Sequence, residues 1–224
     1  MTREDLLNDL AGQIVARKKP SKPLKVGIDG RSASGKSTMA DALGSALVSR
    51  GLEVLRPSVD GFHHPKERRY RKGAFSAAGY YEDAYNYQAV IDYLLKPLSG
   101  DEFPALCRQA AHNWRTDMLD TAPPIPVGAN AVLLFDGLFL FRRELNAYWD
   151  FRILLDIDSA TSVSRALERD TGVLGEADLV RQKYEARYEP AWLIYVTEED
   201  PESKADVIVD NRDYMNPEIR NFFF

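Results

Sequence analysis

A short apolar run followed by a glycine-rich turn constrains the fold of this chain more than any other feature. Residues 24–43 read LKVGIDGRSASGKSTMADAL, which places Gly30, Gly35, Lys36 and Ser37 in the spacing GxxxxGKS between a strand and a helix. Glycines there let backbone N–H groups turn inward around phosphates, and the helix adds its positive N-terminal end. Lys36 can reach the β and γ phosphates, and the Ser37 hydroxyl can ligate Mg²⁺. We therefore predict a loop that binds the phosphates of ATP or GTP, made of Gly30, Ser32, Ala33, Ser34, Gly35, Lys36, Ser37 and Thr38.

Size and composition indicate one globular domain with insertions. The chain has 224 residues, of which 45% are hydrophobic and 28% charged, and no stretch approaches 18 consecutive apolar residues. We therefore expect no membrane partner, and the net charge of −5 argues against non-specific nucleic-acid binding. The single cysteine, Cys107, excludes an intrachain disulfide and offers no zinc site, which favours the reducing cytoplasm. The sequence leaves open whether the chain forms a homo-oligomer.

Apolar runs and helical patterns alternate along the chain. The apolar runs are mostly continuous, which is typical of parallel strands buried on both faces, and the alternation predicts a doubly wound α/β fold. We expect strands at 24–29, 53–59, 131–135, 151–156 and 206–209, and helices at 37–50, 87–98, 159–169 and 177–187.

Three further segments are assigned roles within this single domain. Residues 1–22 contain an amphipathic helix, whose apolar stripe consists of Leu6, Leu7, Leu10, Ile14 and Val15. Long connections in compact domains are usually functional. We therefore expect the connection 62–128 to bind the phosphate acceptor and to contain a hairpin through 103–114. The glycine-bearing stretch at 170–180 is expected to be a lid.

Two carboxylates stand at the ends of predicted strands. Asp60 follows the second strand in SVDGFHH, and Asp136 ends the third in AVLLFDG. Open α/β sheets bind ligands at this edge. We expect Asp60 to take the proton of an acceptor hydroxyl and Asp136 to approach the Mg²⁺ of the phosphate loop. For each of these aspartates the alternative is an ordinary Asp-Gly turn.

Basic and aromatic residues provide further candidates. Arg165 and Arg169 share one helix face and could bind phosphates or stack on adenine, or simply form a solvated face. The run KERRYRK at 66–72 precedes several tyrosines, which would suit an anionic acceptor or a nucleobase, although charged runs are usually solvated. We expect the acceptor itself to contact Phe62, His63, Tyr81, His112 and Arg115.

Taken in order, IDGRSASGKST, SVDGFHHP, LLFDGLFLF, LDIDSATSVSRALERD and ADVIVDN resemble the uridine kinase and phosphoribulokinase family of P-loop kinases. The resemblance covers about residues 24–211. It implies a three-layer P-loop fold with a five-stranded parallel sheet, helices on both faces and a lid. It also implies Mg²⁺- and ATP-dependent phosphorylation of a small molecule's hydroxyl. The catalytic residues would then be Asp60, Lys36 and Arg169, and the metal would be held by Ser37, Asp60 and Asp136.

The departures from the family pattern cluster where the acceptor should bind. The segment YYEDAYNY at 80–87 replaces the FDHPDAFD typical of uridine kinases, Ala166 replaces a paired arginine, and the stretch TGVLG lacks the lid's usual arginines. A nucleoside is the leading acceptor. A sugar phosphate, pantothenate or another nucleoside remains an alternative, as does a nucleotide-hydrolysing regulatory protein, against which the lack of an NKxD motif argues.

Overall fold

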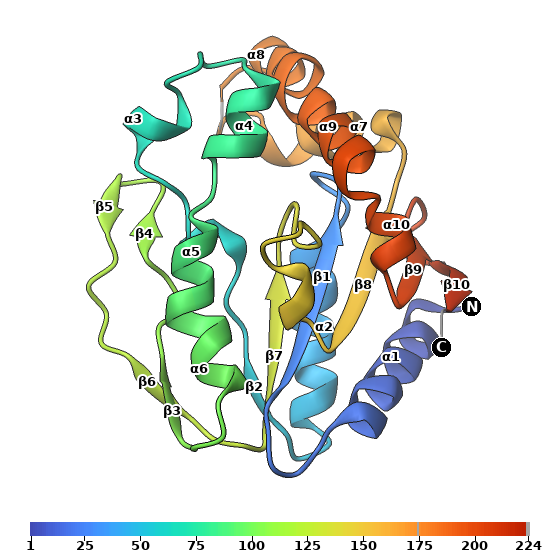
Figure 1. Ribbon diagram of the computed structural model, residues 1–224. Helices are drawn as coiled ribbons and strands as arrows, with labels where there is room; N and C mark the ends of the chain where they lie inside the picture. The colour runs from blue at the N-terminus through green and yellow to red at the C-terminus, as the bar shows by residue number, and fades with distance from the viewer. Residues whose placement is uncertain (174, 223–224) are drawn as a thin grey trace.

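The main sheet carries the phosphate loop at its centre. The computed structural model describes residues 1–173 and 175–222 (Figure 1). The sheet has the strand order β10-β9-β8-β1-β7-β2, and neighbouring strands are parallel except for β10, which is antiparallel to β9. The strands are β1 (Leu24–Gly30), β2 (Glu53–Leu55), β7 (Ala131–Asp136), β8 (Phe151–Asp156), β9 (Val207–Asp210) and β10 (Glu218–Phe222). The predicted α/β fold with five parallel strands is confirmed, with β10 as an additional edge strand.

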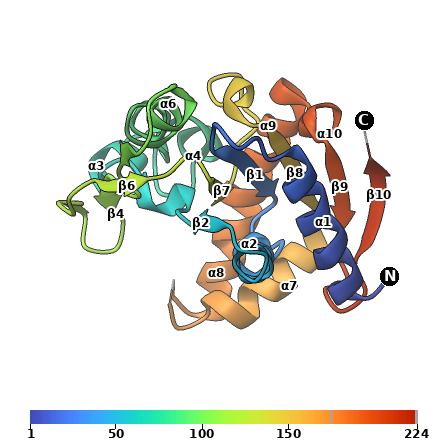
Figure 2. The ribbon, with the colours of Figure 1, turned by 90° about the horizontal axis from the view of Figure 1, so that it is seen from below.

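Helices cover both faces of this sheet (Figure 2). One face packs on α1 (Arg3–Arg17) and α2 (Lys36–Val48), and the other packs on the insertion helices and on α9 (Glu189–Glu199). Along β7, Val132 and Leu134 join the first core while Leu133 and Phe135 join the second. Because successive side chains of a strand point to opposite faces, burial on both sides requires the continuous apolar run seen in the sequence.

The insertion forms a helical layer and two small strand pairs. Tyr87 to Ser99 is one helical run, as predicted, with a π-type turn η2 between two α-helical segments. The expected hairpin is wrong in its pairing, because β3 pairs with β6 and β4 pairs with β5. The elements are η1 (Val59–Gly61), α3 (Lys66–Arg69), α4 (Ala77–Asp83), α5 (Tyr87–Val90), η2 (Ile91–Leu95), α6 (Lys96–Ser99), β3 (Ala105–Cys107), β4 (His112–Asn113), β5 (Met118–Leu119) and β6 (Ile125–Val127).

The C-terminal third supplies the segment predicted to be a lid. The helix expected at 177–187 continues through a π-type turn, η4, into α9, so its predicted end is wrong. Leu174, which belongs to the predicted lid, lies outside the described residues, as do residues 223–224. The elements are η3 (Asn146–Tyr148), α7 (Ser159–Asp170), α8 (Ala177–Lys183), η4 (Tyr184–Tyr188), α9 and α10 (Pro201–Lys204).

Three smaller expectations need correction. Strand β2 ends at Leu55 rather than at residue 59, since Pro57 has no N–H group to donate to the neighbouring strand; Ser58 bridges Asp136 again before η1 begins. The last parallel strand is shifted by one residue, to Val207–Asp210. On α1, Leu6, Leu10 and Ile14 are buried as predicted, but Val15 is 41% exposed.

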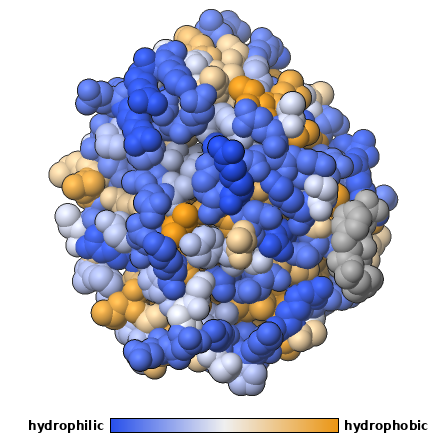
Figure 3. Space-filling model, viewed as in Figure 1, coloured by the Kyte–Doolittle hydropathy of each residue, from blue (hydrophilic) through white to orange (hydrophobic). Residues whose placement is uncertain are grey.

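The surface is mainly polar on the face seen in Figure 3, where apolar residues form small separate patches. Within the described ranges, none of the helices combines the length and apolar character needed to cross a membrane.

Candidate active site

The phosphate loop joins β1 to α2 and adopts backbone conformations that its glycines permit. Gly30 and Gly35 have φ angles of 150° and 92°, and a Cβ on Gly30 would lie 2.4 Å from the Leu155 carbonyl oxygen. Ala33 has a φ of 57°. The buried Ser34 hydroxyl finds no hydrogen-bond partner among the described residues. The loop therefore has the open, strained form of a phosphate cradle.

Lys36 begins α2 and is almost fully buried, with 8% of its surface exposed. Its ammonium donates a hydrogen bond of 2.7 Å to the Arg31 carbonyl oxygen. Burial lowers the pKa of Lys36 to about 8, and the nearby carboxylates of Asp29 and Asp136 oppose this change. Lys36 thus holds a partly desolvated positive charge over the loop, which suits it to anionic phosphates.

Asp136 ends β7 directly beside the start of α2. One of its carboxylate oxygens accepts a 2.6 Å hydrogen bond from the Ser37 hydroxyl, and the other accepts one of 2.6 Å from Arg56. A hydroxyl and a carboxylate are the hard oxygen donors that Mg²⁺ prefers, so this pair fits the metal expected from the sequence. No sequence pattern pointed to Arg56, which lies in the connection after β2.

Asp60 lies in the short turn η1, which follows β2 and is capped by Ser58. Its side chain is exposed on the wall of the pocket described below. Desolvation, followed by repulsion from Asp136, raises the pKa of Asp60, while Lys36 and Arg169 lower it. These residues are therefore close enough to interact electrostatically, as the proposed catalytic set requires.

Arg169 lies in the last turn of α7, and its guanidinium is held by Asp170 and Tyr184. Its guanidinium donates to both oxygens of Asp170, at 2.7 and 2.9 Å, and to the Tyr184 hydroxyl. The Tyr184 hydroxyl also lies 2.9 Å from the Ser32 hydroxyl of the phosphate loop. Tyr184 therefore ties η4 to the loop, although no sequence pattern marked it.

One pocket of about 390 Å³ joins these groups. Ser32, Ala33, Lys36 and Ser37 lie at one end of it with Asp136. Beyond Asp60 the wall is aromatic and basic, formed by His63, Arg69, Tyr70, Tyr80, Tyr85, Trp114, Arg115, Lys183, Arg187 and Tyr188.

A second hollow lies on the other side of the phosphate loop. Its walls include Thr38, Arg165 and Arg169 from the predicted set, together with Arg3, Ala33, Gly35, Met39, Asn211 and Tyr214. Arg165 donates to the carbonyl oxygens of Asn211 and Arg212, and the Asn211 amide donates to the Ser34 carbonyl oxygen at 2.7 Å. The loop after β9 is thereby fastened to the phosphate loop.

Of the five residues expected to contact the acceptor, the structure places two in the pocket wall, His63 and Arg115. The other three are buried behind it, contrary to our expectation. Phe62 packs on Phe135, Tyr81 packs on Phe139 in the core, and His112 lies beside Asp117. Aromatic side chains in such an insertion also build its core, and sequence alone does not separate the two uses.

The basic run 66–72 is divided between surface and pocket. Arg68 and Arg71 pair with Asp83, and Lys72 pairs with Glu82 on the neighbouring helix α4. Arg69 alone among these charged side chains is buried, and it lines the pocket. Most of the run is therefore an ordinary ion-paired surface.

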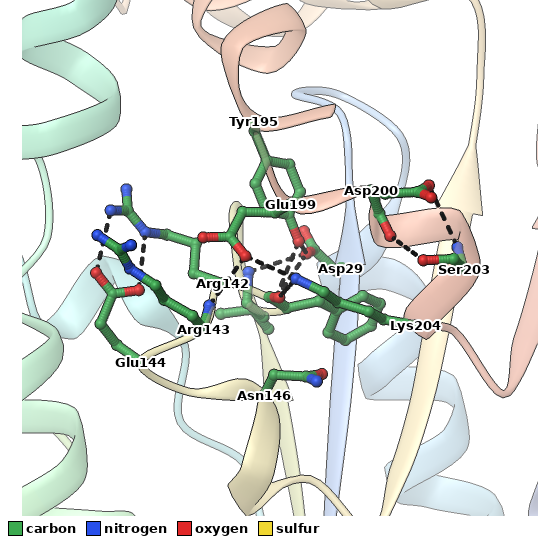
Figure 4. Close-up of polar contacts among 12 residues, drawn as sticks. Asp29, Arg142, Arg143, Glu144, Asn146, Tyr195, Glu199, Asp200, Ser203 and Lys204 are labelled. Carbon is green, nitrogen blue, oxygen red and sulfur yellow. Dashed lines mark hydrogen bonds and ion pairs between the residues drawn. The ribbon is translucent and has the colours of Figure 1, made fainter. Parts of the chain in front are cut away.

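A buried carboxylate braces the back of the site (Figure 4). Asp29, at the end of β1, accepts hydrogen bonds from the backbone N–H groups of Phe139, Leu140 and Phe141. It also accepts one of 2.5 Å from the Tyr195 hydroxyl on α9. Phe139 has a φ of 64°, a conformation that costs energy in a non-glycine residue, and Asp29 holds it there. Its ring contacts Tyr80 and Tyr85 in the pocket wall.

Comparison with known proteins identifies the family. The model of the Phosphoribulokinase / Uridine kinase family matches residues 25–215. Uridine-cytidine kinase B of Dictyostelium discoideum is 29% identical over 192 residues, covering 84% of this chain and 74% of that enzyme. Pantothenate kinase of Streptococcus pyogenes serotype M12 (strain MGAS2096) is 28% identical over 178 residues, covering 75% of this chain and 56% of that enzyme.

Solved structures share the same architecture. The structure described as a possible uridine kinase from Bacillus stearothermophilus has a TM-score of 0.71 at 24% identity, over 92% of this chain and 97% of that one. D-glycerate 3-kinase from Cryptococcus neoformans has a TM-score of 0.59 at 13% identity, over 96% of this chain and 99% of that one. The chain belongs to the phosphoribulokinase/uridine kinase family and is an ATP-dependent small-molecule kinase.

Proposed function

We propose that the protein transfers the γ-phosphoryl group of ATP to a hydroxyl of a small molecule bound beyond Asp60, with a nucleoside as the first acceptor to test. The observation that carries this proposal is the shared pocket, in which Lys36 and Asp136 lie at one end and Asp60 faces an aromatic wall. The similarity to uridine-cytidine kinase B supports a nucleoside, since aromatic rings stack well on bases.

The phosphate loop and Lys36 would bind and orient the donor phosphates. Backbone N–H groups of residues 30–38 cradle the oxygens, and the buried ammonium of Lys36 compensates their charge. Ser37 and Asp136 would hold Mg²⁺, joined by Asp60 across the pocket. When bound, this ion supplies electrostatic stabilisation for the transferring phosphoryl group.

Asp60 would accept the proton of the acceptor hydroxyl. Its raised pKa makes it a better base than an ordinary aspartate, because a general base works best when its pKa approaches the working pH. Arg169 would stabilise the negative charge on the phosphoryl oxygens, since its guanidinium is held in place by Asp170.

The second hollow fits the base and ribose of the nucleotide. Arg165 and Tyr214 lie beside it, with the Arg165 guanidinium 5.8 Å from the Tyr214 ring centroid. A planar guanidinium and a tyrosine ring can both stack on a purine. This assignment gives the loop after β9 a role in binding ATP.

In this proposal the chain is one kinase domain. Residues 62–128 bind the acceptor, residues 170–180 act as the lid and residues 1–22 form the N-terminal helix. A cytoplasmic location is part of the proposal, because the single cysteine can form no internal disulfide.

The proposal is tested by measuring ADP release with uridine, cytidine and a panel of other alcohols. We expect Asp60→Asn to lower kcat by roughly 10²- to 10⁴-fold, the usual contribution of a general base. Binding of the ATP analogue AMPPNP should persist in this variant. Asp9→Asn, the same change on the exposed surface of α1, is the matched control.

Two outcomes would contradict the proposal. Unchanged turnover in Asp60→Asn would remove the assignment of the base. ADP release that is equally fast with and without every acceptor would favour a nucleotide-hydrolysing regulatory protein instead.

A further inference from the structure

The end of the pocket beyond Asp60 carries an excess of positive charge. Three arginines line it, namely Arg69, Arg115 and Arg187. The carboxylates among the described pocket residues are Asp60, Asp136 and Asp170. Asp136 faces the phosphate loop and Asp170 is bound by Arg169, so neither neutralises the basic end.

Arg187 is a buried cation whose partners are neutral. It is 3% exposed, and its guanidinium donates to the carbonyl oxygens of Gly73, Ala74 and Arg69. Its remaining contacts are with the faces of the Tyr70 and Tyr80 rings, at 4.7 and 5.1 Å. Across residues 1–173 and 175–222, no ion pair within 4.0 Å involves Arg187.

Arg69 is also buried and is only loosely paired. It is 7% exposed, and its Nε atom has no hydrogen-bond partner among the described residues. One terminal nitrogen donates to the Trp114 carbonyl oxygen, and the Asp117 carboxylate, itself 39% exposed, lies 3.6 Å away. Arg69 therefore lines the pocket with one of its donor groups, the buried Nε–H, left without a partner in the described part of the chain.

Such an arrangement is costly in the empty protein. A buried guanidinium loses its hydration, and neutral carbonyl groups compensate for that loss less well than an anion does. An anion from the ligand would supply the missing countercharge.

We propose that the phosphate acceptor carries an oxyanion, a phosphate or a carboxylate, which binds to Arg69 and Arg187 with Arg115 at the rim, while its reacting hydroxyl faces Asp60. This inference rests on the proposed kinase function and selects among its acceptors. Guanidinium groups match both oxyanions through paired N–H donors. A neutral nucleoside would bury the same arginines without neutralising them.

Matched pairs of acceptors test the charge directly. The pairs are D-ribose 5-phosphate with D-ribose, D-glycerate with glycerol, and pantothenate with pantothenol, and uridine is added as a neutral nucleoside. For the pair that the enzyme phosphorylates, kcat/KM measured by ADP release should be at least about tenfold higher for the anionic member than for the neutral one. One charge-assisted hydrogen bond contributes enough binding free energy for a difference of that size. The pair that responds distinguishes a phosphate from a carboxylate.

Variants locate the effect at the basic end. Arg115 is exposed, so Arg115→Gln should fold normally, and we expect it to raise KM for the anionic acceptor about tenfold while KM for ATP stays unchanged. Arg115→Lys should recover part of the loss. Arg181→Gln on α8 makes the same change at an exposed arginine outside the pocket and should have no effect.

Binding of inorganic sulfate provides a readout that does not need turnover. In protein loaded with Mg²⁺ and AMPPNP, which fills the phosphate loop, sulfate should bind to the wild type and to Arg181→Gln, and more weakly to Arg115→Gln. Equal turnover of neutral and anionic acceptors would overturn the inference and leave the kinase function intact. Turnover of no acceptor would count against the kinase function, and the sulfate titration would then decide the anion site by itself.

Discussion

Asp136 divides its two carboxylate oxygens between Ser37 and Arg56. Arg56 also pairs with Asp41 and donates to the Ser37 carbonyl oxygen, so a positive charge is held beside the proposed metal site. A cation there repels Mg²⁺ and competes for one of its ligands.

We expect Arg56→Gln to bind the metal more tightly. The Mg²⁺ concentration that gives half-maximal activity should fall on the order of fivefold, since a neighbouring charge in partly wet surroundings is worth about 1 kcal/mol. Activity measured against free Mg²⁺ at saturating ATP tests this. Arg50→Gln, at an exposed arginine after α2, is the control, and a higher Mg²⁺ requirement in Arg56→Gln would show that Arg56 supports the metal.

Cys107 ends β3 and is fully buried within the insertion, and burial raises its pKa to about 11. Because the thiolate is the reactive form, its fraction falls tenfold for each pH unit below the pKa. Native protein at pH 8 should therefore react with a thiol reagent at least about a hundredfold more slowly than urea-unfolded protein, and its rate should still be rising at pH 10. Fast labelling that abolishes activity at pH 7 would contradict the structural role.

At the scale of elements, the position of Asp60 depends on how closely η1 packs against the end of β7. Gly137 follows Asp136, and a Cβ at this residue would lie 2.6 Å from the Cβ of Val59. Both atoms belong to buried, closely packed segments, so neither can give way cheaply.

Gly137→Ala should therefore displace Asp60 while sparing the phosphate loop. We expect kcat to fall about tenfold or more, because small errors in the placement of a catalytic group are costly. The affinity for AMPPNP, measured by titration, should change less than twofold or so. Gly51→Ala does not serve as a control because Gly51 has a φ of 79°, whereas Gly12→Ala on α1 does, since its Cβ would meet nothing within 4 Å.

Sequence patterns predicted the elements whose signals are local. The continuous apolar runs of β1, β7 and β8 predict buried strands. Because Asp60 and Asp136 follow predicted strands, they are expected at the sheet edge where ligands bind. Strand β10 escaped prediction because an edge strand depends on its neighbour β9 rather than on a continuous apolar run. Asp29, Arg56 and Tyr184 escaped for a related reason, since their partners lie far away in the chain.

At the scale of the whole molecule, a bound nucleotide should contact α2, the proposed lid and the loop after β9 at the same time, and so stabilise the folded protein. We expect Mg²⁺ with AMPPNP, at about 100 times its Kd, to raise the free energy of unfolding by about 2.7 kcal/mol. Urea unfolding followed by tryptophan fluorescence measures this. Chelating Mg²⁺ with EDTA should reduce the gain and Lys36→Ala should abolish it, whereas equal stabilisation in all three cases would place the nucleotide elsewhere.

The helical run from α8 to α9 is anchored in the core at its α9 end, and its α8 end packs on α7 through the buried side chain of Val180. Tyr195 anchors α9 to Asp29 in the core, while α8 follows directly on the glycine-bearing stretch at 171–176. The wider π-type turn η4 lies between these two ends, and it carries Tyr184 and Arg187. Any movement of α8 relative to α9 would therefore bend the chain at η4. Because Tyr184 in this turn contacts the phosphate loop and Arg187 lines the pocket, a ligand bound at either place would act directly on the turn.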